Sequence, residues 1–400
     1  MLIECGAAET RAAFLDRGVV THFWFGPARG DEHLPRSPSP GDVFAGRIKS
    51  VSKALNAAFV DIGAGDDAFL PLGKNAAPPV EGAHGVFRIR RPPIDGKGAV
   101  LSSDWRKGLS SAAIADIESK AANGARGEIG ERRDAALCAF FSCATGADKG
   151  DVEIAIDDPS AKMLINASGF ERTKLTQAPF ALENIDCVIE ESLCASVELT
   201  GGARVRIQET AAGAMIDIDS AAAVARSGAR LNEKTNALAL DRIMTEISRR
   251  SIGGRVVIDF LPPGGAGARE SLARLLKDRL KGIDRARFGR VAPDGLADFT
   301  LPRERQTLLE QASEPVGEGW PVCGRRFTLD WSAKAGIRAL ERALRTQPAL
   351  RPRLIVAADM FEYLEHDRPQ WRARIADKFS ARFDIIRSET LKSGAYDIAE

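Results

Sequence analysis

Hydrophobic and polar residues alternate with a period of two in the first quarter of the chain. Residues 11–15 and 19–25 are two such runs, and Asp16-Arg17-Gly18 between them is typical of a hairpin turn. The proline-rich residues 27–41 predict a linker. Short apolar runs and glycine-rich turns then predict a small closed barrel, with strands at 43–48, 57–62, 67–71, 85–90 and 98–102.

A helical period replaces this pattern in the second half of the chain. Apolar residues recur every three to four positions in 233–250 and 268–282, which predicts two amphipathic helices. The alanine-rich residues 105–150 are expected to be helical, and 151–220 to return to strands and turns. A small α/β unit is expected from 325 onward, with helices at 331–345 and 370–381 and strands at 353–357 and 383–386.

Two of the predicted strands end in aspartate. Asp217 and Asp219 end the run 213–220, and Asp259 ends the run 255–260. Residues i and i+2 of a strand point to the same face, so neighbouring strands would bring three carboxylates together. A hard divalent cation such as Mg²⁺ relieves the repulsion between such groups. The alternative is that the aspartates only mark strand ends, which is the better interpretation of either segment taken alone.

Length and composition predict a multidomain globular protein. A chain of 400 residues with 44% hydrophobic residues exceeds one ordinary core, so two to four domains are expected. The apolar runs are shorter than the roughly 18–20 residues of a membrane span. The start, Met-Leu-Ile-Glu-Cys-Gly, lacks the pattern of a signal peptide, so a cytoplasmic location without membrane contact is expected.

Cysteine and histidine usage argues against two classes of enzyme. None of the 6 cysteines forms a Cys-x-x-Cys pair, and the 4 histidines do not pair at helical spacing. A zinc hydrolase and a histidine-based triad are therefore not expected. The cysteines are interpreted as buried free thiols.

Basic residues dominate between Arg249 and Arg305, although the net charge is only +1. A basic stretch beside an acidic cluster suits a polyanion held against a metal. The alternative is an ordinary solvated helix face.

Two blocks of sequence carry a resemblance to a known family. The first block contains Gly46-Arg-Ile-Lys-Ser-Val, Asn56-Ala-Ala-Phe-Val-Asp-Ile-Gly63, Ala68-Phe-Leu-Pro71 and Gly96-Lys-Gly-Ala99. The second contains Ile216-Asp-Ile-Asp-Ser220, Lys234-Thr-Asn236, Ile252-Gly-Gly-Arg-Val-Val-Ile-Asp-Phe260, Asp284-Arg285 and Gly295-Leu296. In this order and spacing they resemble the catalytic half of the ribonuclease E/G family of bacterial endoribonucleases.

The resemblance implies a multidomain α/β fold. An OB-fold barrel of the S1 type, at 41–104, would be inserted into an RNase H-like subdomain formed by 1–40 and 105–200. A metal-dependent nuclease domain at 201–318 and a small α/β domain at 325–400 would complete the chain.

The resemblance also implies roles for individual residues. Asp217 and Asp259 match the aspartates that bind catalytic Mg²⁺, and Asp219 matches a position where the family usually has Asn. RNA-binding residues are expected in the barrel and in the second helix and its basic neighbours, at Phe59, Phe69, Lys97, Arg269 and Arg303. The aromatic pair would stack on bases of single-stranded RNA, although barrel core is the alternative for both rings.

Three departures from the family pattern change what is expected. The family senses a 5′-monophosphate with an Arg-Thr motif after the barrel, but an alanine-rich stretch follows Trp105 here. The family joins protomers through zinc on a Cys-Pro-x-Cys motif, but the matching stretch Trp320-Pro-Val-Cys-Gly324 keeps one thiolate, Cys323. Neither 5′-end sensing nor the zinc link is therefore expected. The third departure is Asp219, whose extra negative charge would repel a phosphate.

We predict a Mg²⁺-dependent endoribonuclease that cleaves single-stranded RNA and leaves 5′-phosphate and 3′-hydroxyl ends, in RNA processing or decay. One alternative is a degenerate relative that binds RNA without cutting it, and a more distant one is a scaffold for other proteins. Assembly into a homo-oligomer stays open.

Overall fold

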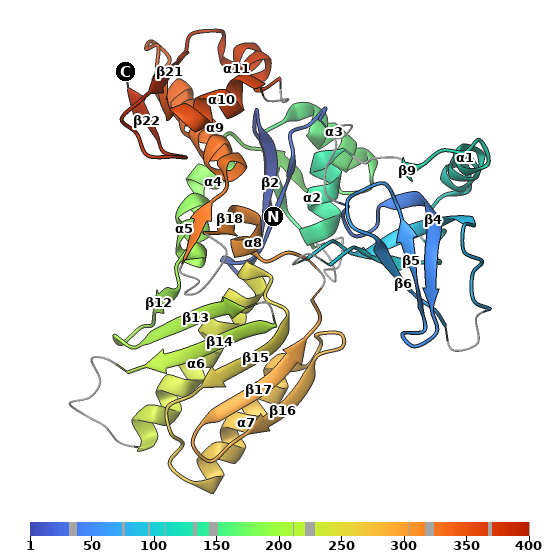
Figure 1. Cartoon of the computed structure of the whole chain (residues 1–400). Coiled ribbons are helices and arrows are strands. Elements are labelled where there is room, and N and C mark those ends of the chain that lie inside the picture. Colours follow the sequence, from blue (N-terminus) through green and yellow to red (C-terminus); the bar gives the residue numbers. More distant parts are fainter. Residues whose placement is uncertain are drawn as a thin grey trace.

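Four α/β or all-β units make up the chain. The computed structural model describes residues 1–31, 38–73, 77–94, 97–107, 109–130, 134–143, 151–210, 212–220, 229–303, 305–316, 324–366 and 370–399. Figure 1 shows the N-terminal sheet in the middle, with the barrel to its right, a six-stranded unit below it and the C-terminal unit above it. This architecture confirms the predicted multidomain α/β class.

The N-terminal sheet uses strands from both sides of the barrel insertion. Its order is β11-β10-β1-β2-β3, in which β1–β3 are antiparallel, β10 is parallel to β1 and β11 is parallel to β10. Arg17 and Gly18 have φ values of 49° and 78°, as a two-residue hairpin loop requires. The RNase H-like assignment stays a prediction. The elements of this unit are β1 (Leu2–Cys5), β2 (Glu9–Asp16), β3 (Val19–Pro27), α2 (Ala135–Cys143), β10 (Ile154–Ile156), α3 (Pro159–Ala167), β11 (Thr173–Leu175), α4 (Pro179–Leu182) and α5 (Ile185–Leu193).

The predicted closed barrel is confirmed. Its strands follow the order β4-β5-β6-β8-β7, and β4 pairs with both β5 and β7, which closes an OB-like barrel. Alternate residues such as Ala58, Val60, Ala68 and Leu70 fill its interior. The strands are β4 (Val43–Ser52), β5 (Ala57–Asp61), β6 (Ala68–Pro71), β7 (His84–Arg91) and β8 (Val100–Ser102).

The barrel unit continues beyond the predicted boundary at 104. β9 (Gly127–Glu128) pairs with β4, and α1 (Ser111–Ala122) buries Ile117 against Trp105 and Val43. The expectation of strands and turns in 151–220 is also wrong in part, because α3, α4 and α5 lie there. These three helices are short, so the periodicity of their apolar residues does not distinguish them from strands.

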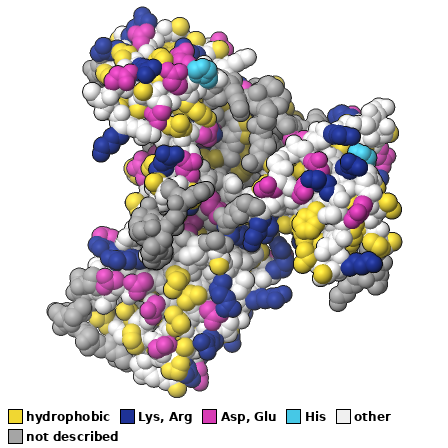
Figure 2. Space-filling model, viewed as in Figure 1, with side chains coloured by type: hydrophobic (Ala, Val, Ile, Leu, Met, Phe, Trp, Pro, Cys, Tyr) yellow, Lys and Arg dark blue, Asp and Glu magenta, His cyan; other side chains and the backbone are white. Residues whose placement is uncertain are grey.

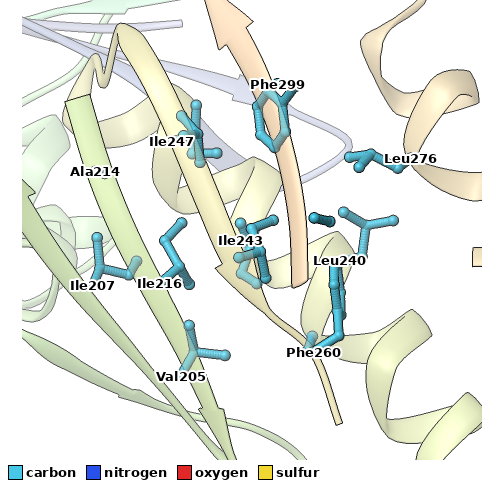
Figure 3. Packing of buried hydrophobic residues seen from close by; sticks show 14 of the residues in the cluster. Val205, Ile207, Ala214, Ile216, Leu240, Ile243, Ile247, Phe260, Leu276 and Phe299 are labelled. Atoms are coloured by element: carbon cyan, nitrogen blue, oxygen red, sulfur yellow. The ribbon is translucent and has the colours of Figure 1, made fainter. Parts of the chain in front are cut away.

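The six-stranded sheet has two helices on one face and an open opposite face. Its order is β12-β13-β14-β15-β17-β16, and α6 is the crossover between the parallel strands β14 and β15. Figure 3 shows Leu240, Ile243 and Ile247 of α6 and Leu276 of α7 packed on Ile216 and Phe299 of the sheet. The elements are β12 (Ser196–Glu198), β13 (Arg204–Thr210), β14 (Gly213–Asp219), α6 (Ala229–Arg250), β15 (Gly254–Asp259), α7 (Ala266–Leu280), β16 (Arg287–Val291) and β17 (Leu296–Leu301).

A glycine lets β15 start close to β14. Gly254 has a φ of 92°, and a Cβ there would lie 2.4 Å from the carbonyl oxygen of Ala212. Any side chain would therefore separate the two strands that carry the aspartates.

The C-terminal unit is a three-stranded sheet with helices, as predicted from 325 onward. Its order is β21-β20-β22, and α9 packs on it through Ile337 and Leu340. Within the described residues no helix is both long and apolar enough to cross a bilayer. The elements from 305 to the end are α8 (Leu308–Ala312), β18 (Ser313–Pro315), β19 (Arg325–Phe327), α9 (Leu329–Thr346), β20 (Arg353–Ala357), α10 (Ala358–His366), α11 (Trp371–Phe379), β21 (Asp384–Ser388) and β22 (Tyr396–Ala399).

Candidate active site

Asp217 and Asp259 are direct neighbours at the ends of two parallel strands. The register of β14 and β15 sets Asp217 opposite Asp259. Both side chains are exposed on the open face of the sheet, because Ile216 and Ile258 take the buried positions beside them. Neighbouring strands are about 4.8 Å apart, so one cation could bind both carboxylates.

Asp219 lies on the same face but one step further along β14. Its side chain is half-buried, two residues beyond Asp217. Among the described residues, no group of three or more His, Cys, Asp or Glu side chains could hold a metal ion. The expected convergence of three carboxylates on one ion is therefore wrong, and the pair Asp217 and Asp259 remains as the candidate ligand set.

Asn236 fixes the loop that follows Asp259. This residue of α6 is 2% exposed, and its side chain donates to the carbonyl of Leu261 at 2.8 Å and accepts from its N–H at 3.1 Å. Asn232, one helical turn earlier, donates to the carbonyl of Pro262 at 3.2 Å. The Lys-Thr-Asn part of the family resemblance thus corresponds to a structural support behind the aspartate pair.

Two arginines face the aspartates from β13, and the sequence analysis missed them. Arg206 is opposite Asp217, and Arg204 is opposite Asp219. Arg204 and Arg206 alternate with the buried residues Val205 and Ile207. This alternation predicts both arginines on the open face, so it is the sequence signal that could have found them.

Of the two arginines expected to bind RNA outside the barrel, only Arg303 is clearly separated from the aspartates. Arg269 lies half-buried in the first turn of α7, in the segment that follows Asp259. Arg303 lies beside Gly253, at the opposite end of β15 from Asp259, and forms an ion pair with Glu310. Arg303 is therefore remote from the candidate metal ligands.

The basic stretch 249–305 is not one surface. Arg249 and Arg250 are buried against Glu246, and Arg249 donates to the carbonyl of Val20 at 2.6 Å. These two arginines therefore do not contribute to a surface for a polyanion, although they lie in the basic stretch. Arg287 and Arg290 of β16 are exposed. Figure 2 shows Lys and Arg side chains gathered along the side of the six-stranded unit that faces the barrel.

Phe59 and Phe69 form a cross-strand pair on the outside of the barrel. They are opposite each other on β5 and β6, with ring centroids 5.9 Å apart. Both are half-buried, and neither belongs to the cluster that fills the barrel. The barrel-core alternative for these rings is therefore wrong, and the pair is accessible to a ligand.

Lys97 lies in the turn before β8, close in sequence to the strand position that pairs with Phe69. Its side chain is exposed, and its backbone forms a bridge with Ile94. Two residues later, the carbonyl of Ala99 accepts from the N–H of Phe69 at 2.7 Å. Lys97 and the aromatic pair thus belong to neighbouring strand positions.

The structure bears on one of the three departures from the family pattern, the Arg-Thr motif. An Arg-Thr pair that the sequence analysis did not take up lies at Arg172 and Thr173, where β11 begins. Arg172 pairs with Glu153 at 2.6 Å, and the hydroxyl of Thr173 donates to the carbonyl of Phe170. Cys323 and its motif lie outside the described residues, so the zinc prediction is untested. The expectation of buried thiols is wrong for Cys187 and Cys194, which are exposed.

Comparisons with known proteins agree on one family. The Ribonuclease E/G family model matches residues 159–304. Ribonuclease E of Haemophilus influenzae is 25% identical over 263 residues, which cover 62% of this chain and 28% of that protein. Ribonuclease E of Buchnera aphidicola is 25% identical over 230 residues, or 55% of this chain and 25% of that protein. Ribonuclease E of Synechocystis is 28% identical over 145 residues, which cover 35% of this chain and 20% of that protein.

The matches cover only part of this chain and only part of each relative. The chain spans about a quarter of the length of these curated relatives. A solved multidomain protein with nucleic acid binding domains from Streptococcus pneumoniae is 17% identical and covers 29% of this chain and 42% of that one. Its TM-score of 0.16 is too low to support any comparison of folds. On the family match and the three relatives, the chain is similar to the ribonuclease E/G family.

Proposed function

We propose that this protein is a Mg²⁺-dependent endoribonuclease for single-stranded RNA that leaves 5′-phosphate and 3′-hydroxyl ends. The observation that carries the proposal is the register of β14 and β15, which makes Asp217 and Asp259 adjacent on an open sheet face. The relatives named Ribonuclease E support an endoribonuclease-type function.

The aspartate pair fits Mg²⁺. This ion takes one or two protein carboxylates and fills its remaining positions with waters and substrate phosphates. Asp217 and Asp259 provide two adjacent carboxylates on an exposed surface, which leaves room for the other ligands. When bound, Mg²⁺ would supply Lewis-acid stabilisation of the charge on the phosphate. Asn236 would keep Asp259 in place through its two bonds to Leu261.

The barrel supports a preference for single strands. Phe59 and Phe69 present two ring surfaces on its exterior, and unpaired bases can stack on such surfaces whatever their sequence. The exposed Lys97 adds positive charge in the turn before β8. We propose that the barrel holds the RNA while the aspartate pair cleaves it.

A binding protein without cleavage activity is the second candidate. It is favoured by Asp219, whose carboxylate adds negative charge two residues from Asp217. Such charge would repel the phosphate unless a positive group offsets it. This candidate predicts RNA binding through the barrel and no product.

A cleavage assay with matched variants separates the two candidates. Labelled A/U-rich RNA is incubated with Mg²⁺ and the wild-type protein, Asp217→Asn, Asp259→Asn or Asp241→Asn. Asp241 is an exposed carboxylate of α6, on the helix-covered side, and pairs with Arg279. We expect cleavage to be lost in the first two variants and kept in the third, while all bind RNA. Full cleavage by Asp217→Asn or Asp259→Asn would refute the assigned site, and a wild-type protein that binds but never cleaves would favour the second candidate.

A further inference from the structure

We infer that Arg206 binds the scissile phosphate beside the aspartate pair, and that Arg204 offsets the charge of Asp219. The inference rests on the proposed function, because it concerns the same site. It assigns a phosphate-binding role to β13, a strand on which neither the sequence analysis nor the family resemblance assigned a residue.

The register brings Arg206 into the row of the aspartates. Arg206 pairs with Asp217, which pairs with Asp259 in the next strand. Paired residues of adjacent strands point to the same face, so all three side chains lie on the open face. Arg206 therefore lies about 4.8 Å, one strand spacing, from Asp217, in the same row as Asp259. A phosphate held at the aspartate pair would be near this arginine.

Arg206 is available for a ligand. It is exposed, and among the residues that the structure describes its side chain has no ion pair or hydrogen bond, although Asp217 is directly opposite. The guanidinium fork matches two phosphate oxygens, and such bidentate pairs are stronger and more specific than contacts of a point charge. This favours a phosphate over a base edge as its ligand.

Arg204 addresses the repulsion that Asp219 would cause. It is opposite Asp219 on the same face. Its ion pair with Glu198, at 3.2 Å, is between side chains that are 41% and 81% exposed. An exposed pair of this kind is weak, so Arg204 can respond to RNA at little cost. The strand β13 thus supplies two positive charges against the three negative charges of Asp217, Asp219 and Asp259.

The test compares Arg206→Gln and Arg206→Lys with Arg351→Gln. Arg351 is also an exposed arginine, lies in the C-terminal unit and pairs with Asp384, so its loss controls for net charge. Three quantities are measured: cleavage of single-stranded RNA with Mg²⁺, RNA binding against salt in EDTA, and binding of Mg²⁺ alone. EDTA prevents metal-dependent cleavage during the binding measurement.

We expect Arg206→Gln to lower kcat about 100-fold, the effect of removing one donor to a charged transition state. The slope of log K against log salt should shrink by about 0.7, the value for one phosphate contact on a single strand. Binding of Mg²⁺ should become tighter, because a repelling charge is removed, and unfolding damage would not produce that change. Arg206→Lys should keep the salt slope and lose part of kcat, and Arg351→Gln should match the wild type.

If Arg206→Gln and Arg351→Gln give the same result in all three measurements, the inference is overturned, while the proposed nuclease activity is not affected. If the wild-type protein does not cleave, the proposed function fails, and the salt slope together with the Mg²⁺ titration still decides the role of Arg206. An unchanged slope and unchanged Mg²⁺ binding in that case would also refute the inference.

Discussion

The carboxamide of Asn236 holds both polar atoms of the Leu261 backbone. Its NH₂ group donates to the Leu261 carbonyl at 2.8 Å, and its oxygen accepts from the Leu261 N–H at 3.1 Å. An amide can make both bonds, whereas a carboxylate has no donor. Because Leu261 lies two residues after Asp259, this side chain ties the crossover helix α6 to the strand end that carries the proposed metal ligand.

Asn236→Ala should lower both stability and cleavage. It removes two bonds and leaves the half-buried N–H and carbonyl of Leu261 without these partners, at a cost of about 2 kcal/mol. Urea unfolding gives the free energy, and cleavage at saturating Mg²⁺ gives the activity. Asn232→Ala, which loses one exposed bond to Pro262, should cost less in both. Equal losses in the two variants would show that the two-point contact has no special role.

Phe59→Ala and Phe69→Ala should weaken RNA binding and leave the barrel folded. Each stacked base contributes about 1–3 kcal/mol, so each variant should bind a short single strand at least fivefold less tightly. The rings lie outside the barrel core, so the melting temperature should change little. Leu55→Ala, at a position that is 60% exposed in the same barrel, is the control for loss of surface apolar area. If the two Phe variants and Leu55→Ala bind RNA with the same affinity, the aromatic pair of the barrel is not part of the RNA-binding site.

Much of the fold follows from local patterns. The hairpin at Asp16-Arg17-Gly18, the barrel strands and the long helices have strong periodicity or a specific turn, and all lie near their predicted positions. The short helices α4 and α5 begin after residues in the left-handed region, Ala178 and Asn184. No sequence signal marks such starts, so tertiary contacts decide them. The packing of α1 on the barrel likewise depends on contacts that are distant in sequence.

The candidate site is predictable only in part, because local patterns determine which face of a strand a residue lies on but not the register between strands. Strand periodicity is enough to put Asp217 and Asp219 on one face, but the opposition of Asp217 and Asp259 is a matter of register between strands 42 positions apart in the chain. Burial of Arg249 and Arg250 depends on packing of α6 against β3, which includes a contact between Ser248 and His22. Charge counts along the sequence do not contain that information.

Glu246→Gln should destabilise the protein strongly. Glu246 is fully buried and accepts from Arg249 and Arg250, and its contact with Arg242 is 3.1 Å long. Removing one partner of a buried ion pair costs about 3–5 kcal/mol, because the remaining charges stay desolvated. Chemical unfolding measures the loss, and Asp241→Asn, which breaks an exposed pair with Arg279, should cost under about 1 kcal/mol. Similar costs for the two would mean that the buried network contributes no more than a surface pair.

The pKa of Glu341 should make the stability of the protein depend on pH. This carboxyl on α9 accepts from the N–H of Ala7, and burial, reinforced by Glu4, raises its pKa from 4.5 to about 7. Lys378, Arg345 and the Ala7 bond act in the opposite direction. The folded protein therefore binds a proton more tightly than the unfolded chain does. Its stabilising effect is complete below about pH 4.5 and is lost as the pH rises through 7.

Glu341→Gln, which mimics the protonated carboxyl, should remove this dependence. The variant should gain stability relative to the wild type between pH 4 and pH 8, by on the order of 3 kcal/mol for a shift of this size. Unfolding free energies of both proteins at the two pH values provide the measurement. Because other titrating groups are the same in both proteins, their effects cancel in the difference. A difference that is constant with pH would show that Glu341 ionises in the folded protein as freely as in the unfolded chain, so that its burial under the Ala7 turn imposes no cost.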